Sequence, residues 1–300
     1  MEILTLSQVS KSFGSQKVID DLSFQVSENT IYGFIGENGA GKTTTMKMIL
    51  GLYPMDAGVI KVNGEKVTYG QTKTNRFIGY LPDVPEFYGY MTPTEYLKLC
   101  GEITGISSRQ MKTRIPELLE LVGLDKSVKR IQGFSRGMKQ RLGIAQALLN
   151  QPKLLICDEP TSALDPIGRK EIIDILQSVK EKTTVIFSTH ILSDVERICD
   201  EIGLLHQGKL AFQGKMEEIR KLRRSDGFEI EFYQEEDARR FTVVYKGGEM
   251  ISKTQLFFAG KAEEDMAAAM KALYDNHIHP IKIEMREPTL ESLFLEVVAQ

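Results

Sequence analysis

The chain has 300 residues, 42% of them hydrophobic, and its formal net charge is −3 at pH 7. This length allows one large or two modest domains. No stretch of about 18 apolar residues occurs, which argues against a membrane-spanning helix, and the first residues do not resemble a secretory signal. Three scattered cysteines without metal-ligand spacing fit a reducing cytosol. No basic stripe with interleaved aromatic residues is present, so we expect no nucleic-acid partner.

The charge is distributed unevenly along the chain. Residues 1–225 hold 30 basic and 26 acidic side chains, whereas residues 226–300 hold 8 basic and 15 acidic ones. The first part therefore has a positive balance and the second part a negative one. This shift in composition favours two domains with a boundary near residue 220.

A strand, a glycine-rich loop and a helix start follow one another early in the chain. Residues 31–35 form a short apolar run typical of a buried strand, and residues 42–50 have helical composition. Glycines between them let backbone N–H groups converge on phosphate oxygens, and a helix N-terminus adds the positive end of its dipole. The pattern predicts a phosphate site in which Lys42 reaches the β- and γ-phosphates and the Thr43 hydroxyl binds Mg²⁺. The other expected contacts are Gly36, Asn38, Gly39, Ala40, Gly41 and Thr44.

The middle of the chain, about residues 85–150, is rich in helical patterns. Thr92, Pro93 and Glu95 have the types expected of an N-cap, a first-turn proline and a capping-box glutamate. Residues 109–122 repeat apolar side chains at helical spacing. Pro116 falls inside that repeat and predicts either a kink or a fresh helix start.

Two carboxylates end the next apolar run, at residues 153–157. Parallel strands present ligand sites at their carboxyl ends, so Asp158 is expected to hold Mg²⁺ directly or through water. Glu159 is the candidate general base that orients or deprotonates an attacking water. Two ordinary acidic residues after a strand would be the simpler interpretation for this pair alone. Its combination with Lys42 and Thr43 favours the catalytic one.

Two further motifs complete an ordered set. Residues 134–138, with the sequence FSRGM, lie between the phosphate loop and the acidic pair, and His190 follows the apolar run at 184–187. The four motifs and their order resemble the nucleotide-binding subunit of an ATP-binding cassette (ABC) transporter. The resemblance implies that Ser135 and Gly137 contact the γ-phosphate held by a second subunit. It also implies that His190 reaches the γ-phosphate and positions the water and Glu159.

The resemblance extends to an aromatic side chain ahead of the phosphate loop. Phe13 stands where the family places a ring that stacks on adenine, a contact that contributes about 1 kcal/mol. A core position in an N-terminal strand is an equally good interpretation of this phenylalanine.

The chain departs from the commonest family pattern at two places that matter for the site. Arg136 stands where glycine is usual, and Asp83 stands where a glutamine is usual. Both departures are similar to bacterial exporter-type members with a C-terminal extension, such as the ATPases of drug, antibiotic and sodium exporters. Asp83 is a candidate ligand for Mg²⁺ because carboxylate oxygens suit that ion. The alternative is an acidic loop residue with no metal contact.

The last part of the chain mixes strand and helix patterns. Residues 228–232 and 281–285 alternate apolar and polar side chains as strands do, and residues 262–274 are alanine-rich with one apolar helical face. A closing helix is predicted at 288–297. We therefore expect an α/β fold, with a P-loop NTPase ABC cassette at residues 1–220, its helical subdomain at about 85–150, and a small α+β extension at 221–300. The extension is expected to serve dimerisation or regulation.

The resemblance implies an ATP-binding, ATP-hydrolysing subunit of an ABC exporter. Its cofactors would be ATP and Mg²⁺. Its partners would be a separate transmembrane permease subunit and a second copy of itself or a related ATPase subunit, which would close around ATP. The subunit would be cytoplasmic and peripheral at the inner face of the cell membrane. The alternatives are a soluble ABC ATPase without a transport role and a nucleotide-dependent regulatory module.

Overall fold

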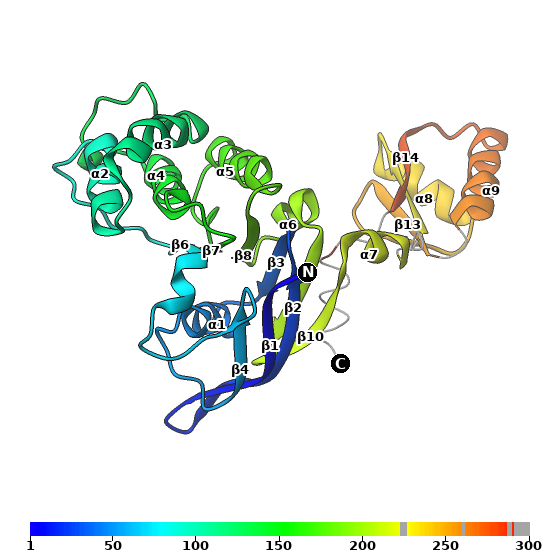
Figure 1. The fold of residues 1–300 in the computed structure, drawn as a ribbon. Coiled ribbons are helices and arrows are strands. Elements are labelled where there is room, and N and C mark those ends of the chain that lie inside the picture. Colours follow the sequence, from blue (N-terminus) through cyan, green and yellow to red (C-terminus); the bar gives the residue numbers. More distant parts are fainter. Residues whose placement is uncertain (223–226, 260–261, 287–289, 291–300) are drawn as a thin grey trace. The chain divides into compact units, whose positions relative to one another are not determined.

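The computed structural model describes residues 1–222, 227–259, 262–286 and 290 (Figure 1). The chain forms two compact units, residues 1–216 and residues 217–300. The helix predicted at 288–297 falls outside the described residues except at position 290. In the described part of the chain, no helix has the length and apolar character needed to cross a bilayer.

The first unit begins with an antiparallel sheet in the order β2-β1-β4-β5. Its strands are β1 (Glu2–Phe13), β2 (Gln16–Ser27), β4 (Ala57–Val62) and β5 (Glu65–Lys66). Strands β1 and β2 form a hairpin whose turn holds Gly14 at φ 59°, a backbone conformation that suits glycine. Buried side chains of β1, β2 and β4 join β3 and α1 in one apolar core.

A six-stranded sheet in the order β10-β9-β3-β8-β7-β6 forms the centre of the first unit. Its strands are β3 (Ile31–Gly36), β6 (Ile78–Leu81), β7 (Leu154–Asp158), β8 (Thr184–Thr189), β9 (Glu201–His206) and β10 (Lys209–Lys215). Every residue of β3, β7 and β8 is buried, as expected for parallel strands covered on both faces. Their parallel pairing brings the carboxyl ends of β3, β7 and β8 to the same edge of the sheet.

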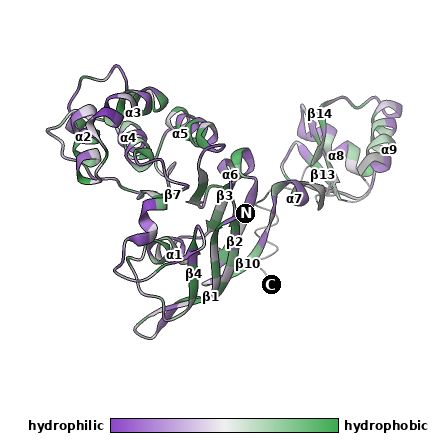
Figure 2. Cartoon of the chain, in the orientation of Figure 1, coloured by the Kyte–Doolittle hydropathy of each residue, from purple (hydrophilic) through white to green (hydrophobic). Residues whose placement is uncertain are grey.

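Some helices of the first unit pack against this sheet, and α2, α3 and α4 form a group beside it. The helices of this unit are α1 (Lys42–Ile49), α2 (Pro93–Ile103), α3 (Ser108–Leu121), α4 (Arg136–Leu148), α5 (Pro166–Val179) and α6 (Leu192–Ile198), with short 3₁₀ turns η1 (Lys73–Phe77) and η2 (Ile131–Gly133). Helices α2, α3 and α4 lie together in Figure 1, and α3 and α4 carry both polar and apolar colours in Figure 2.

Of two sequence predictions about helix starts, the structure confirms one and contradicts the other. The capping box that begins α2 is present: Thr92 accepts a hydrogen bond from the Glu95 backbone, and the Glu95 carboxylate accepts one from the Thr92 backbone. Pro116, however, lies inside α3, which runs without interruption from Ser108 to Leu121. The expectation of a fresh helix start at Pro116 is therefore wrong, because the apolar face of α3 packs as one surface and outweighs the missing backbone donor.

The second unit is a four-stranded antiparallel sheet in the order β12-β13-β11-β14, with helices. Its strands are β11 (Gly227–Phe232), β12 (Gly248–Met250), β13 (Gln255–Ala259) and β14 (Pro280–Arg286), and its helices are α7 (Met216–Leu222), α8 (Glu235–Val244) and α9 (Ala262–Asp275). Phe228, Phe241 and Phe258 are buried in its apolar core, to which β11, β13, α8 and α9 contribute.

Candidate functional site

The loop between β3 and α1 has a backbone that glycine makes possible. Gly39 and Gly41 have φ values of 87° and 109°, in the region that side chains with a Cβ disfavour. A Cβ on Gly41 would also lie 3.1 Å from the carbonyl oxygen of Val18. The loop then ends as the N-terminus of α1, whose first backbone N–H groups have no carbonyl partner within the helix. Such a helix start is an anion site.

The side chain of Lys42 lies across this loop and is held by carbonyl oxygens of the loop backbone. Its side chain is buried, and its Nζ donates to the carbonyl oxygens of Gly36 at 2.7 Å and Glu37 at 3.1 Å. The same Nζ lies 3.2 Å from Oε1 of Glu159, at the end of β7. A buried ammonium needs such partners, because an unpaired charge would be costly to remove from water. The lysine is therefore fixed where the loop would cradle an anion.

A chain of hydroxyls and one carboxylate joins α1, β7 and β8. Thr43 Oγ1 donates to Asp158 Oδ2 at 2.7 Å, and Ser188 Oγ donates to Asp158 Oδ1 at 2.6 Å. The sheet register places Asp158 opposite Ser188, so the contact follows from the pairing of β7 with β8. A hydroxyl beside a carboxylate is a donor set that Mg²⁺ uses when phosphates and waters complete its shell. Among the described residues, no group of three His, Cys, Asp or Glu side chains offers a metal site made of protein alone.

Glu159 and His190 face one another at the same edge. Nδ1 of His190 lies 2.9 Å from Oε2 of Glu159, and the Glu159 backbone N–H donates to Ser188 Oγ at 3.1 Å. Glu159 has φ 48°, an unusual value for a residue with a Cβ, which points to a backbone constrained by function. Its Oε1 is a buried acceptor that makes no hydrogen bond despite the nearby Lys42 ammonium. The Glu159 carboxylate lines the cavity and is a candidate general base.

Lys42, Thr43 and Glu159 line one cavity of about 270 Å³ at the edge of the central sheet, whereas Asp158, Ser188 and His190 are not among its lining residues. The lining residues are Val18, Asn38, Gly39, Gly41, Lys42, Thr43, Thr44, Asp83 and Glu159. The structure thus brings most of the predicted phosphate-loop residues together with Glu159 and Asp83. Gly36 closes β3 below this loop, and Ala40 donates its backbone N–H to the Glu37 carbonyl oxygen within the loop.

Phe13 lies outside this lining, at the end of β1. Its side chain is 46% exposed, and its ring meets the Tyr53 ring edge to face with centroids 5.6 Å apart. The core interpretation of Phe13 is therefore wrong, because β1 ends at the hairpin turn, beyond the sheet's buried face. Its contact with adenine stays a prediction.

Ser135 and Gly137 also lie outside the cavity lining. Ser135 is the N-cap of α4, where its Oγ accepts the Met138 backbone N–H at 3.3 Å, and its side chain is exposed. A Cβ on Gly137 would come no closer than 3.9 Å to Leu164, so nothing in the single chain requires glycine there. The single chain therefore leaves this second helix N-terminus open for an anion from elsewhere.

The sequence pattern did not single out Ser188, and it did not indicate which residue Arg136 contacts. Ser188 is fully buried and links the candidate metal ligand Asp158 to the backbone of Glu159. Arg136 pairs with Asp83 across 3.1 Å, although 53 positions separate them. The parallel pairing of β7 and β8 was the available signal for Ser188. No local pattern signals the second contact.

Other ionisable groups near the site stay protonated. Burial raises the pKa of the Cys157 thiol well above its usual range, with the adjacent Asp158 carboxylate adding to the rise. Burial also raises the pKa of Tyr80 to about 12, and Asp158 contributes as a nearby negative charge. Neither group supplies an anionic nucleophile at neutral pH.

The chain is similar to known proteins along its full length. A family model described as "ABC transporter" matches residues 19–162. The Bacitracin transport ATP-binding protein BcrA of Bacillus licheniformis is 39% identical over 308 residues, which cover 99% of this chain and 97% of that protein. The Nod factor export ATP-binding protein I of Ralstonia nicotianae is 31% identical over 304 residues, which cover 99% of this chain and 94% of that protein.

A solved structure agrees with these relatives. The structure titled "Structure of ATP binding subunit of ABC transporter" superposes with a TM-score of 0.66 at 34% identity, and it covers 73% of this chain and 92% of that one. The fold of the first unit is thus that of this family. The chain belongs to the ATP-binding proteins of ABC transporters, and it binds and hydrolyses ATP.

Proposed function

We propose that this chain is the ATPase subunit of an ABC exporter and that it acts as a dimer closed around ATP. The chain has no membrane span in its described residues, so a separate permease would provide the path through the membrane. The names of the relatives, bacitracin transport and Nod factor export, favour transport over the soluble or regulatory alternatives. Association with a permease would hold the chain at the cytoplasmic face of the membrane.

The observation that carries this proposal is the set of contacts at the end of β7. Lys42, Glu159 and His190 form one chain of polar contacts, at 3.2 Å and 2.9 Å. Lys42 and the loop N–H groups bind the β- and γ-phosphates of ATP, and Glu159 accepts the proton of the attacking water while His190 orients it. Phosphoryl transfer to water depends on positioning and on charge stabilisation rather than on a covalent intermediate.

Mg²⁺ fits the donors next to this chain. Thr43 and Asp158 would hold the ion, with phosphate oxygens and waters as its other ligands. When bound, Mg²⁺ would neutralise charge on the phosphates. Asp158 is buried and both of its oxygens are already hydrogen-bonded, so the protein presents this carboxylate in one orientation.

Ser135 and Gly137 carry the dimer part of the proposal. They form an open helix N-terminus that does not line the chain's own cavity. In a head-to-tail dimer each chain would bring this helix start to the ATP held by its partner. We assign residues 221–300 a role in dimerisation or regulation, since the described part of that unit contains no comparable set of phosphate-binding and acidic side chains.

The test is the ATP-bound oligomeric state of Glu159→Gln, measured by light scattering. Loss of the base should lower turnover by about 10²- to 10⁴-fold, and trapped ATP should then stabilise a dimer. Glu102→Gln, which alters an exposed carboxylate on α2, is the matched control and should behave as wild type. A Glu159→Gln chain that stays monomeric with ATP, both alone and with its permease co-expressed, would contradict the composite site.

A further inference from the structure

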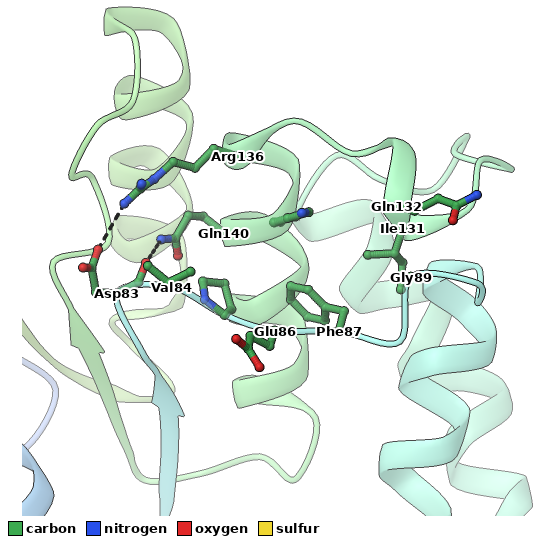
Figure 3. A pocket seen from close by; sticks show the side chains of 11 residues that line it. Asp83, Val84, Glu86, Phe87, Gly89, Ile131, Gln132, Arg136 and Gln140 are labelled. Atoms are coloured by element: carbon green, nitrogen blue, oxygen red, sulfur yellow. Dashed lines mark hydrogen bonds and ion pairs between the residues drawn. The ribbon is translucent and has the colours of Figure 1, made fainter.

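The two departures from the family pattern touch each other. Arg136 Nη2 lies 3.1 Å from Asp83 Oδ1, and both side chains are close to half exposed (Figure 3). Asp83 follows β6, whereas Arg136 is the first residue of α4, directly after the N-cap Ser135. Ion pairs this exposed contribute little to folding stability, about 0–1 kcal/mol. Because folding stability gains little from this pair, we looked for an effect of the pair on the nucleotide cavity.

Helix α4 is tied to the loop after β6 by more than this pair. Gln140, one turn beyond Arg136 and fully buried, donates its Nε2 to the Asp83 carbonyl oxygen at 2.6 Å. Figure 3 shows both side chains reaching from the same helix face toward the loop. On that face Gly143 leaves room for Leu81, whose side chain any Cβ at this position would strike. The first two turns of α4 are thus fixed against Asp83.

Asp83 borders two cavities. It lines the nucleotide cavity with Thr43 and Glu159. It also lines a second cavity, the one drawn in Figure 3, to which Arg136 and Lys139 of α4 contribute. The nucleotide cavity contains one cation, Lys42, and that ammonium already faces the Glu159 carboxylate. An unpaired Asp83 would add a further negative charge beside the phosphates of ATP. At the effective dielectric of a protein surface, such a charge repels a polyphosphate measurably.

We propose that Arg136 is a positioning residue for nucleotide binding: it neutralises Asp83 at the wall of the nucleotide cavity and holds that carboxylate toward α4. This inference rests on the proposed function, because it takes the Lys42 cavity as the ATP site. It makes a definite statement about Asp83. The carboxylate acts as the ion-pair partner of Arg136, and its effect on nucleotide affinity depends on that arginine.

The test is a double-mutant cycle of Arg136→Gln and Asp83→Asn. Binding of a non-hydrolysable ATP analogue with Mg²⁺ is measured by calorimetry. Arg136→Gln alone should weaken binding about 10-fold, since it leaves Asp83 unpaired. Asp83→Asn alone should strengthen binding a few-fold. The double variant should return to within about threefold of wild type, because the charge that Arg136 offsets is gone.

Two further measurements separate this role from a merely structural one. The loss caused by Arg136→Gln should shrink as salt is raised, because screening weakens the repulsion by Asp83. The thermal unfolding midpoint should change little in all three variants. Lys139→Gln removes another cation of the second cavity without breaking the pair, and it should bind the analogue as wild type does.

Three outcomes would overturn the inference. Arg136→Gln could bind normally, Asp83→Asn could weaken binding as loss of a metal ligand would, or the double variant could be as poor as Arg136→Gln. Lys42→Met distinguishes this from failure of the proposed function. If Lys42→Met abolishes binding while the cycle shows no coupling, only the role of Arg136 is contradicted. If Lys42→Met binds normally, the cavity itself is not the ATP site.

Discussion

The two units of the chain bury different kinds of side chain. Within the described residues, every buried polar or charged side chain lies in residues 1–216, Lys42, Asp158 and Ser188 among them. The described core of residues 217–300 is built from apolar side chains, with stacked Phe228 and Phe258 at its centre. Burying polar groups is costly unless they are hydrogen-bonded, whereas apolar burial stabilises by itself. The comparison teaches that the first unit buries polar groups at its candidate ATP site, Lys42, Asp158 and Ser188 among them, whereas the described core of the second unit is apolar.

The largest expected effect is a loss of stability in residues 217–300 that leaves nucleotide binding by residues 1–216 unchanged. Phe241→Ala removes a fully buried ring that packs against Phe232, Tyr245 and Phe258. The free energy of unfolding of that unit should fall by about 3–5 kcal/mol, the usual cost of such a truncation. Denaturant titration followed by tyrosine fluorescence or hydrogen exchange of β11 measures this loss. The affinity for an ATP analogue should stay the same.

Tyr274→Ala is the matched control, because Tyr274 is a large aromatic residue of the same unit that is 81% exposed. It should change the unfolding free energy by less than about 0.5 kcal/mol. A parallel loss of nucleotide binding in Phe241→Ala would break the comparison, since it would show that the two units are energetically coupled.

The next effect is the reverse: we expect a loss of ATP affinity with little change in the unfolding free energy. Lys42→Met removes the ammonium held by Gly36, Glu37 and Glu159. Hydrogen bonds to charged groups contribute about 1.5–3 kcal/mol, so ATP affinity should fall up to about 100-fold. Calorimetric titration measures it, with exposed Lys61→Met on β4 as the control. Unchanged binding would mean that the cavity around Lys42 is not the ATP site.

A smaller effect sharpens the comparison inside the first unit. Ser188→Ala deprives Asp158 of a donor and removes one of the two acceptors of the Glu159 backbone N–H, which keeps the Ser188 carbonyl oxygen at 3.2 Å. The unfolding free energy should fall by about 1–3 kcal/mol, the cost of leaving buried partners unsatisfied. Because Ser188 orients the candidate base, kcat should fall more than KM rises.

Ser178→Ala serves as its control, since Ser178 donates only to the Ile175 carbonyl oxygen of its own helix. An equal loss of stability in both variants, with no change of kcat in either, would assign Ser188 a purely structural role.

The smallest effect concerns a surface contact of the second unit. Arg239→Ala breaks an exposed pair with Glu235, one turn away on α8, with Nη2 and Oε1 2.6 Å apart. Pairs of this spacing contribute about 0.2–0.5 kcal/mol. The unfolding free energy should change by no more than that, and raised salt should remove the difference. A loss as large as that of Phe241→Ala would contradict the view that the apolar core contributes more to the stability of this unit than its surface ion pairs do.

The sequence by itself determined the family and the α/β class, and it predicted the phosphate-binding role of the loop before α1. Glycines at positive φ, a lysine at a helix start and an acidic pair after an apolar run are local patterns, and local patterns persist in the chain before it folds. The capping box at Thr92 and Glu95 is of the same kind. It was predicted correctly because it depends on residues three positions apart.

Only the tertiary structure decided contacts between distant segments. The register of β7 against β8 brought Ser188 to Asp158, and the packing of α4 on β6 brought Arg136 to Asp83. It also left Pro116 inside a continuous helix and Phe13 exposed, where local propensity allowed other outcomes. The physical reason is common to all of these residues. Their positions depend on which elements pack together, and that choice is made by the free energy of the whole core rather than by any one segment.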